Sequence, residues 1–377
     1  MEETIVEQSE KQTAKEWILK RCPKFSLVIF FICFIAVCIH ITCVISTSFA
    51  DFYNQNIGAF FRAVLAYLTK YLPFSLAETI IIALPAILFL MIYISVKMIK
   101  RSDNASIRCI VGLFSVLTLM YSIFVLGYGM GYHGSTLAKK LDLEEKPVTA
   151  SELKYTAETI LGEMEGLLDG VQYANTGSSV MPYSLDEMNK KLNQAYKKAT
   201  EKYGFIQDLN SNIKYIVLSE PMTYTHISGV YSYYTGEANL NINFPDYTLP
   251  FTAAHEFAHQ RGIAPENEAN FVAFLVCMES DDPYIKYCGY MNMFDYVTNA
   301  LYSASPEMYY EVFAKTDTRI VYEMVGFGNF FAKYRESTAS EVADVVNDTY
   351  LKVQGQTNGT ASYGMVVDLA VAYYKQK

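Results

Sequence analysis

The sequence predicts an α-helical membrane region followed by an α+β domain that is mostly helical and contains a small antiparallel sheet. The chain has 377 residues, which is more than one typical domain. Apolar residues make up 51% of the total, and the long apolar blocks are confined to the first third. The remaining two thirds show helical and strand periods. We therefore expect an N-terminal segment at 1–24, a membrane region at 25–130 and a folded domain at 131–377.

Three apolar blocks, at about 25–50, 75–96 and 107–130, are long enough to cross about 30 Å of hydrocarbon. A cleavable signal peptide is a poorer interpretation of the first block, because its apolar core is long and no clear small-residue cleavage site precedes Asp51. Pro85 lies inside the second block, where a membrane helix tolerates it with a kink. The blocks predict a multi-pass protein of the cell membrane, in contact with the lipid bilayer.

Basic residues set the expected orientation, because cytoplasmic loops are enriched in Lys and Arg. They precede the first block and crowd the loop between the second and third, at Lys11, Lys15, Lys20, Arg21, Lys24, Lys97, Lys100, Arg101 and Arg108. Both segments are therefore expected in the cytoplasm. The loop at 51–74 carries Arg62, Lys70 and an amphipathic aromatic pattern typical of a helix on the outer surface. With three spans, the domain after Gly131 is expected to be extracytoplasmic.

Each element of this domain has its own local pattern. Helices are expected at about 149–170 and 185–203, the first opening with a capping box of Thr149 and Glu152. Strands are expected at 213–218, 227–234 and 237–244, the last two around the turn Thr235-Gly236. Later patterns are helical, at about 250–261, 266–280, 284–303, 306–316, 319–334, 339–353 and 361–375.

Charge and cysteine content exclude two other classes of protein. The net charge of −9 argues against a nucleic-acid partner, because binding to phosphates needs concentrated Lys and Arg. The seven cysteines do not form a disulfide framework. Cys277 and Cys288 are the pair in the polar part, and we expect two buried thiols there.

A catalytic motif, His255-Glu256-Phe257-Ala258-His259, lies in the first of the later helices. Its two histidines are four residues apart, so on a helix both imidazoles project from one face and can hold one Zn²⁺ ion. Glu256 can then act on a water as the general base. The competing interpretation is a surface helix with incidental histidines. It is disfavoured because the motif uses two of only five histidines and precedes a carboxylate-rich helix start.

A zinc site of this kind needs a third protein ligand and leaves the fourth position for water. Glu266 and Asn270 share one face of the next helix, so Glu266 is the preferred ligand and Asn270 is expected to hydrogen-bond a ligand histidine. Glu268 is the alternative ligand. It lies about 200° around the helix from Glu266, so both carboxylates cannot face the metal.

The segment Thr235 to Asn243 runs just before the motif and is the candidate for binding substrate. As an edge strand it would pair with an extended peptide by β-augmentation, with Glu237 and Asn239 contacting the substrate. Glu237 is also open to interpretation as a metal ligand or as a group that holds a substrate amine. An ordinary amphipathic strand is the simpler alternative.

Three segments follow the apolar blocks in order: Tyr-Thr-Gly-Glu-Ala-Asn at 234–239, Pro-Phe-Thr-Ala-Ala-His-Glu-Phe-Ala-His-Gln-Arg-Gly at 250–262, and Glu-Asn-Glu-Ala-Asn-Phe at 266–271. In this combination the chain resembles, over nearly its whole length, a bacterial membrane family named domain of unknown function 3810, which is regarded as a family of zinc peptidases. The paired motifs are more distantly similar to the gluzincin peptidases. That similarity implies a zincin-like fold with Glu266 as ligand and Asn270 in support, although Asn270 replaces the usual aspartate.

The sequence thus predicts a membrane-anchored zinc metallopeptidase that hydrolyses a peptide or protein substrate outside the cytoplasm. A non-catalytic zinc-binding membrane protein, such as a sensor or an envelope-assembly factor, is the main alternative. Glu256 argues against it, because structural zinc sites close with four protein ligands and need no base. An intramembrane protease is disfavoured because the motif lies far beyond the last apolar block.

Overall fold

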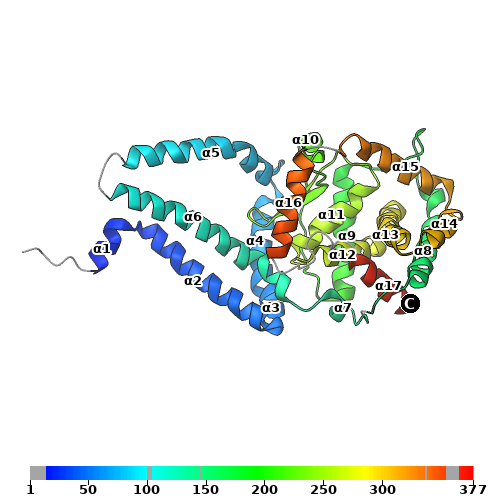
Figure 1. Ribbon diagram of the computed structural model, residues 1–377, viewed down its shortest axis with the longest axis horizontal. Helices are drawn as coiled ribbons and strands as arrows, with labels where there is room; N and C mark the ends of the chain where they lie inside the picture. Colours follow the sequence, from blue (N-terminus) through cyan, green and yellow to red (C-terminus); the bar gives the residue numbers. More distant parts are fainter. Residues whose placement is uncertain (1–13, 100–103, 145, 336–337, 354–364, 377) are drawn as a thin grey trace, which may run out of the picture. The chain divides into compact units, whose positions relative to one another are not determined.

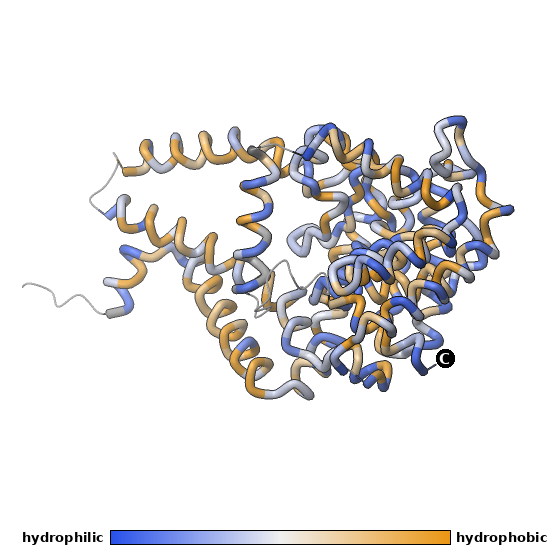
Figure 2. Tube along the Cα trace, turned by 45° about the vertical axis from the view of Figure 1, so that its right-hand side comes forward, coloured by the Kyte–Doolittle hydropathy of each residue, from blue (hydrophilic) through white to orange (hydrophobic). Residues whose placement is uncertain are grey.

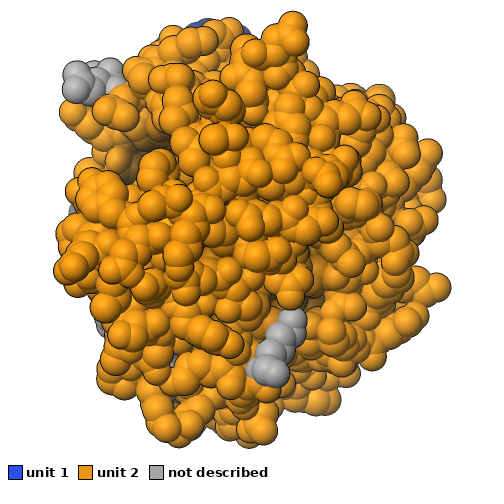
Figure 3. Space-filling view, turned by 90° about the vertical axis from the view of Figure 1, so that its right-hand side faces the viewer, with its two compact units in different colours: residues 1–41, 79–125 blue, residues 42–78, 126–377 orange. Residues whose placement is uncertain are grey.

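The computed structural model describes residues 14–99, 104–144, 146–335, 338–353 and 365–376 (Figure 1). These residues are mostly helical and include a three-stranded sheet. The chain divides into two compact units, one formed by residues 1–41 and 79–125 and the other by residues 42–78 and 126–377. Each unit is therefore assembled from two separate stretches of sequence. Figure 3 shows one face of the second unit, in orange.

Three of the described helices are long and apolar enough to cross a membrane: α2 (Lys24–Ile45), α5 (Leu76–Ile99) and α6 (Ala105–Gly127). Figure 2 shows orange, hydrophobic residues along most of their length. A short helix, α1 (Ala14–Arg21), precedes them. The first apolar block was expected to be one helix as far as residue 50, and this is wrong. The chain breaks at Ser46, whose hydroxyl accepts a hydrogen bond from the N–H of Phe49 and so caps the next helix.

Polar and aromatic contacts join α2 to α6 within the first unit. The Nδ1 atom of His40 lies 2.7 Å from the hydroxyl of Tyr121, and the hydroxyls of Ser26 and Ser115 lie 3.2 Å apart. Such contacts between apolar helices are a common way to pair them. The basic residues Lys11, Lys100 and Arg101, used above for the orientation, lie outside the described residues.

The segment between the first two apolar helices belongs to the second unit. It contains α3 (Thr47–Tyr53), the π-helix η1 (Asn54–Gly58) and α4 (Ala59–Lys70). One face of α4 is buried and consists of Ala59, Arg62, Ala66 and Thr69. Its other face exposes large apolar side chains, namely Phe60, Val64, Tyr67 and Leu68. The amphipathic helix expected here is therefore present. Its buried face packs against the rest of the second unit, to which it belongs.

The rest of the second unit is a set of packed helices. They are α7 (Leu137–Lys140), α8 (Ala150–Glu165), α9 (Leu185–Tyr203), α10 (Ser219–Thr223), α11 (Thr248–Gln260), α12 (Glu266–Glu279), α13 (Pro283–Ala304), α14 (Pro306–Phe313), α15 (Thr318–Ala332), α16 (Thr338–Val353) and α17 (Val366–Gln376), with the 3₁₀ turns η2 (Gly129–His133) and η3 (Leu168–Gly170). The predicted capping box of Thr149 and Glu152 is formed. Residues 361–364, expected in the last helix, lie outside the described residues.

The three strands are β1 (Lys214–Tyr215), β2 (Gly229–Ser232) and β3 (Glu237–Leu240), in the spatial order β1-β3-β2. β2 and β3 pair antiparallel, as predicted, with Tyr231 opposite Ala238. β1 pairs parallel to β3, so the sheet is mixed and the prediction of a purely antiparallel sheet is wrong. β3 is also the central strand, whereas an edge strand was expected. This order depends on a distant pairing that no local pattern encodes.

The core of the second unit surrounds α12, in which every residue from Glu268 to Cys277 is buried. Helices α11 and α13 pack on it, and Phe257, Phe274 and Phe294 are almost fully enclosed. Cys277 and Cys288 are both free and buried in this core, which confirms the prediction of two buried thiols.

Candidate metal centre

Helices α11 and α12 are joined by a tight turn that brings their ends together. The N–H of Gly262 donates to the carbonyl of His259, and the N–H of Ile263 donates to the carbonyl of Ala258. These two bonds form a Schellman motif, in which the residue after the helix takes a left-handed conformation. Gly262 fills that position with φ +88°. The sharp reversal that a short connection to Glu266 requires is therefore made at this glycine.

The reversal brings His255, His259 and Glu266 together, with one ligand atom of each within 4.8 Å of the others. The Oε2 atom of Glu266 lies 3.2 Å from Nε2 of His255 and 3.4 Å from Nε2 of His259. Two ligands held about 2.0–2.2 Å from a zinc ion at tetrahedral angles are about 3.3–3.6 Å apart. Both the spacing and the donor set of two imidazoles and one carboxylate thus fit a zinc ion with an open fourth position.

The ring of His259 is held in the tautomer that a metal ligand needs. Its Nδ1 lies 2.8 Å from the carbonyl of Ile263, and because a carbonyl only accepts, Nδ1 carries the hydrogen. Nε2 then faces Glu266, and the proton that it shares with this carboxylate is the one that a metal ion would displace. The hydroxyl of Tyr128 lies 3.0 Å from the same Nδ1, where its oxygen can accept a share of that one hydrogen.

The three groups also stabilise one another electrostatically. Burial alone would raise the pKa of Glu266, but the imidazoles of His259 and His255 hold it well below its usual range. Burial alone would lower the pKa of His259, but the Glu266 carboxylate outweighs it and raises this pKa to about 9. Glu266 is therefore ionised at neutral pH and lies between the two imidazoles.

Glu256 lies beside the cluster on α11 and is 4% exposed. Burial raises the pKa of its carboxyl to about 7, although the imidazoles of His255 and His259 act in the opposite direction. Its Oε2 atom is buried and has no hydrogen-bond partner among the described residues. A carboxyl group with an unpartnered oxygen can accept a proton from a water that enters the site and release it again.

Glu268, the alternative ligand, points elsewhere. Its Oε1 atom accepts a hydrogen bond of 2.7 Å from the N–H of Leu137 at the first residue of α7. The side chains of Glu266 and Glu268 therefore point in different directions, as the angle between them around the helix requires. Glu266 joins the histidines, and Glu268 caps a neighbouring helix.

Asn270 is buried one turn after Glu266. Its Nδ2 atom has no hydrogen-bond partner in the described part of the chain, and neither has Nδ1 of His255. The expected hydrogen bond from Asn270 to a histidine of the cluster is therefore not formed, and the Nδ1 hydrogen of His259 is instead donated to the carbonyl of Ile263.

Glu237 and Asn239, the candidate substrate-binding residues, are almost fully buried and bind the chain itself. The two carboxylate oxygens of Glu237 accept from the N–H groups of Leu76 and Ala77, at 3.0 and 2.9 Å, and so cap the start of α5. The Oδ1 atom of Asn239 accepts from the hydroxyl of Ser75 at 2.7 Å. The pairing of β3 on both sides also excludes β-augmentation on this strand. Both residues thus have contacts that support the fold.

Sequence reasoning missed three residues around the centre: Tyr128, Asn54 and Arg62. Tyr128 contacts His259 as described above, and its ring stacks on that of Tyr233 with centroids 5.5 Å apart. One signal was available for Arg62. It is the charged member of a stripe otherwise made of Ala59, Ala66 and Thr69, a pattern typical of close helix packing.

A model of the family described as protein of unknown function (DUF3810) matches residues 53–371 of the chain. The match begins at the last residue of α3 and ends inside α17, so it includes η1 and α4 as well as helices α11 and α12. No curated protein and no solved structure matches the chain.

Proposed function

The chain belongs to the DUF3810 family, and we propose that it is a membrane-anchored, zinc-dependent peptidase that acts on peptides or proteins outside the cytoplasm. One observation carries the proposal: His255, His259 and Glu266 meet at distances that suit the ligands of one tetrahedral zinc ion. The basic residues at both cytoplasmic positions predicted above support the orientation.

The chain's own groups suit peptide hydrolysis. His255, His259 and Glu266 would hold the zinc ion, which would supply Lewis acidity to acidify a water and polarise the carbonyl of the bond to be cleaved. Glu256 takes the proton from that water through its unpartnered Oε2 and delivers it to the leaving amine. The Nδ1 hydrogen bond of His259 to Ile263 keeps its Nε2 aimed at the site throughout.

A non-catalytic zinc protein fits these contacts less well. Such a site has no need for Glu256, and a buried carboxyl with a free oxygen destabilises a fold that gains nothing from it. The presence of Glu256 beside the three candidate ligands therefore favours a catalytic site over a structural one.

The test uses the full-length protein purified in detergent, because the second unit includes residues 42–78. Metal content is measured by mass spectrometry for wild type, His259→Ala, Glu266→Gln and the matched control Glu268→Gln. About one zinc per chain is expected in wild type and in Glu268→Gln, and loss is expected in the other two. Cleavage of a peptide library by Glu256→Gln is expected to fall about 100-fold or more while zinc is retained.

Two results would contradict the proposal in different ways. A folded wild type without zinc would remove the metal centre. A zinc-loaded wild type whose peptide cleavage equals that of Glu256→Gln would leave a metal protein without this activity.

A further inference from the structure

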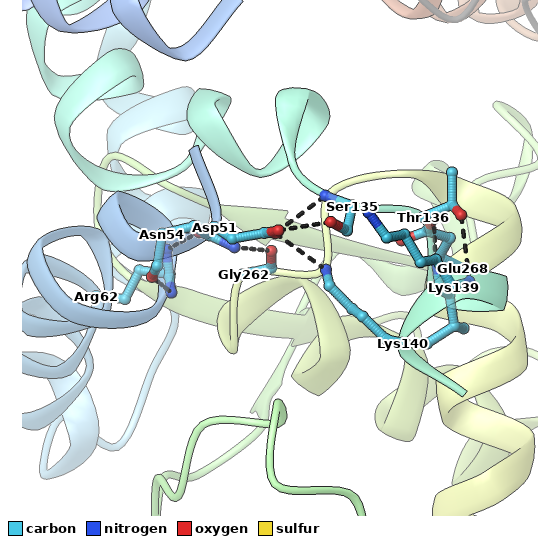
Figure 4. Close-up of polar contacts among 10 residues, drawn as sticks. Asp51, Asn54, Arg62, Ser135, Thr136, Lys139, Lys140, Gly262 and Glu268 are labelled. Carbon is cyan, nitrogen blue, oxygen red and sulfur yellow. Dashed lines mark hydrogen bonds and ion pairs between the residues drawn. The ribbon is translucent and has the colours of Figure 1, made fainter. Parts of the chain in front are cut away.

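The turn between α11 and α12 determines where Glu266 meets the histidines, because five residues separate the two helices. Within this turn, the main-chain carbonyl of Gly262 accepts a hydrogen bond from another part of the protein. The Nδ2 atom of Asn54 donates to it at 2.9 Å, across 208 positions of sequence (Figure 4). Asn54 is the first residue of the π-helix η1, and π-helical turns occur often at functional sites.

Arg62 sets the orientation of the Asn54 amide. Its Nη1 donates to Oδ1 of Asn54 at 2.8 Å, and its Nη2 donates to the main-chain carbonyl of Asn54 at 2.7 Å. A guanidinium has no acceptor, so Oδ1 must face Arg62 and Nδ2 must face Gly262. The direction of the hydrogen bond to the turn is therefore fixed by the arginine.

The guanidinium is itself held in one place. Arg62 is 1% exposed, and its Nη1 also donates to the carbonyl of Gly127 at 3.0 Å. A Cβ atom placed on Gly262 would lie 2.4 Å from Nη2 and 2.5 Å from Cζ of Arg62. The arginine thus packs directly against the turn, and the glycine leaves the space it needs.

A second set of contacts holds the chain after α6 to the same region. Ser135 donates from its N–H and its hydroxyl to Asp51, at 3.0 and 2.6 Å (Figure 4). Glu268 accepts from Leu137, and a Cβ on Gly131 would lie 2.8 Å from the carbonyl of Gly262. The turn is therefore contacted both by residues that precede α5 in the sequence, such as Asn54, and by residues that follow α6, such as Gly131.

We propose that Asn54, oriented by Arg62, is a positioning residue of the metal centre, so that the loop between the first two apolar helices places Glu266 for metal binding. The assignment rests on the proposed function in that the ligand cluster binds a metal. It implies that residues 131–377 alone do not form a fully competent centre, because they lack Asn54, Arg62 and Tyr128.

The variant Asn54→Asp tests this contact with little other change. Aspartate keeps an acceptor for Arg62 but replaces the Nδ2 donor with an oxygen that repels the carbonyl of Gly262. The added negative charge by itself favours a bound cation, so weaker metal binding cannot be attributed to charge. Asn56→Asp is the matched control, because Asn56 lies two residues further on η1 and its exposed side chain donates to the carbonyl of Phe52 in the adjoining α3, at 2.8 Å.

Zinc affinity is measured by chelator competition on the full-length protein in nanodiscs, and the Co²⁺ absorption spectrum reports ligand geometry. Asn54→Asp is expected to bind zinc about 10- to 100-fold more weakly and to show an altered Co²⁺ spectrum, whereas Asn56→Asp matches wild type. Protection of Cys277 and Cys288 from thiol reagents shows that each variant is folded.

Affinity and spectrum of Asn54→Asp equal to those of Asn56→Asp would overturn the assignment while leaving the proposed function intact. If Asn54→Asp exposes the thiols, Arg62→Lys decides, because lysine keeps the charge but cannot bind both oxygens of Asn54 in the same fork. Unchanged zinc affinity in Arg62→Lys would then overturn the assignment. Wild type without metal would overturn the proposed function and this assignment together.

Discussion

Replacing Gly262 with alanine should destabilise the second unit for two separable reasons. The first is conformational: Gly262 has φ +88°, and an L-residue in the left-handed region costs about 1–2 kcal/mol, offset by about 0.4–1 kcal/mol because alanine restricts the unfolded chain. The second is steric, because the new Cβ would lie 2.4 Å from Nη2 of Arg62. The guanidinium is fixed by hydrogen bonds and must give up at least one of them to move.

The size of each effect follows from these contacts. A hydrogen bond from a charged donor contributes about 1.5–3 kcal/mol, and the Nη2 bond to Asn54 is the one nearest the new methyl group. Together with the conformational cost, Gly262→Ala should lose about 3 kcal/mol. Gly204→Ala is the control for conformation alone. Gly204 also has positive φ, at +50°, but a Cβ there meets nothing within 4 Å, so its loss should be about 1 kcal/mol.

The assay follows the labelling rate of Cys277 in the full-length protein by a maleimide, with the site of labelling read by mass spectrometry. Cys277 is 0% exposed, so it reacts through opening of the core, and its rate follows the population of the open form when closing is fast. At about tenfold per 1.4 kcal/mol, labelling should rise about 100-fold in Gly262→Ala and about fivefold in Gly204→Ala. Equal rates in the two variants would refute the steric contact between Arg62 and the turn.

Three further predictions test other parts of the structure. Removing metal with a chelator should lower the unfolding temperature, and zinc at about 1,000 times its Kd should restore about 4 kcal/mol in wild type but nothing in His255→Ala, as calorimetry can measure. Glu237→Gln should reduce thermal stability by weakening the cap on α5 yet leave KM for cleaved peptides within about threefold, since its carboxylate binds Leu76 and Ala77; a large rise in KM would return it to substrate binding. Burial, together with Glu323, raises the pKa of Asp295 from 3.8 to about 7, so stability should be greatest below the unfolded pKa and fall as the pH rises through about 7. Asp295→Asn should therefore stabilise the protein at about pH 8 more than at about pH 5 in urea titrations, and an equal effect at both would contradict the raised pKa.

Local patterns predicted the elements that carry the ligands. The four-residue spacing of His255 and His259 and the polar face of Glu266 and Asn270 are properties of single helices, so the sequence could place the three candidate ligands on two adjacent helices. The choice between Glu266 and Glu268 followed from the same helical geometry, and the structure places Glu266 in the cluster.

Distant pairings were beyond such reasoning. The position of β3 at the centre of the sheet depends on β1, which precedes it by more than twenty residues. Tyr128 and Asn54 reach the centre across 131 and 208 positions, and no period in the sequence encodes contacts of that range. Glu237 was expected to contact substrate because its strand was interpreted as an edge strand just before the motif, whereas its carboxylate accepts from the N–H groups of Leu76 and Ala77.

The range of the Asn54 contact with Gly262 also determines when the turn between α11 and α12 can be completed during synthesis. Asn54 leaves the ribosome 208 residues before its partner, a delay of about 10–40 s at ordinary rates of synthesis. During that time the Nδ2 donor of Asn54 lacks its acceptor at Gly262, although Arg62 can already bond Asn54 and the carbonyl of Gly127, and loop closure over this range is slow. A nascent chain that stops before residue 262 therefore keeps the Asn54 amide without its acceptor in the turn, so an interruption of synthesis before that point leaves the ligand turn unformed.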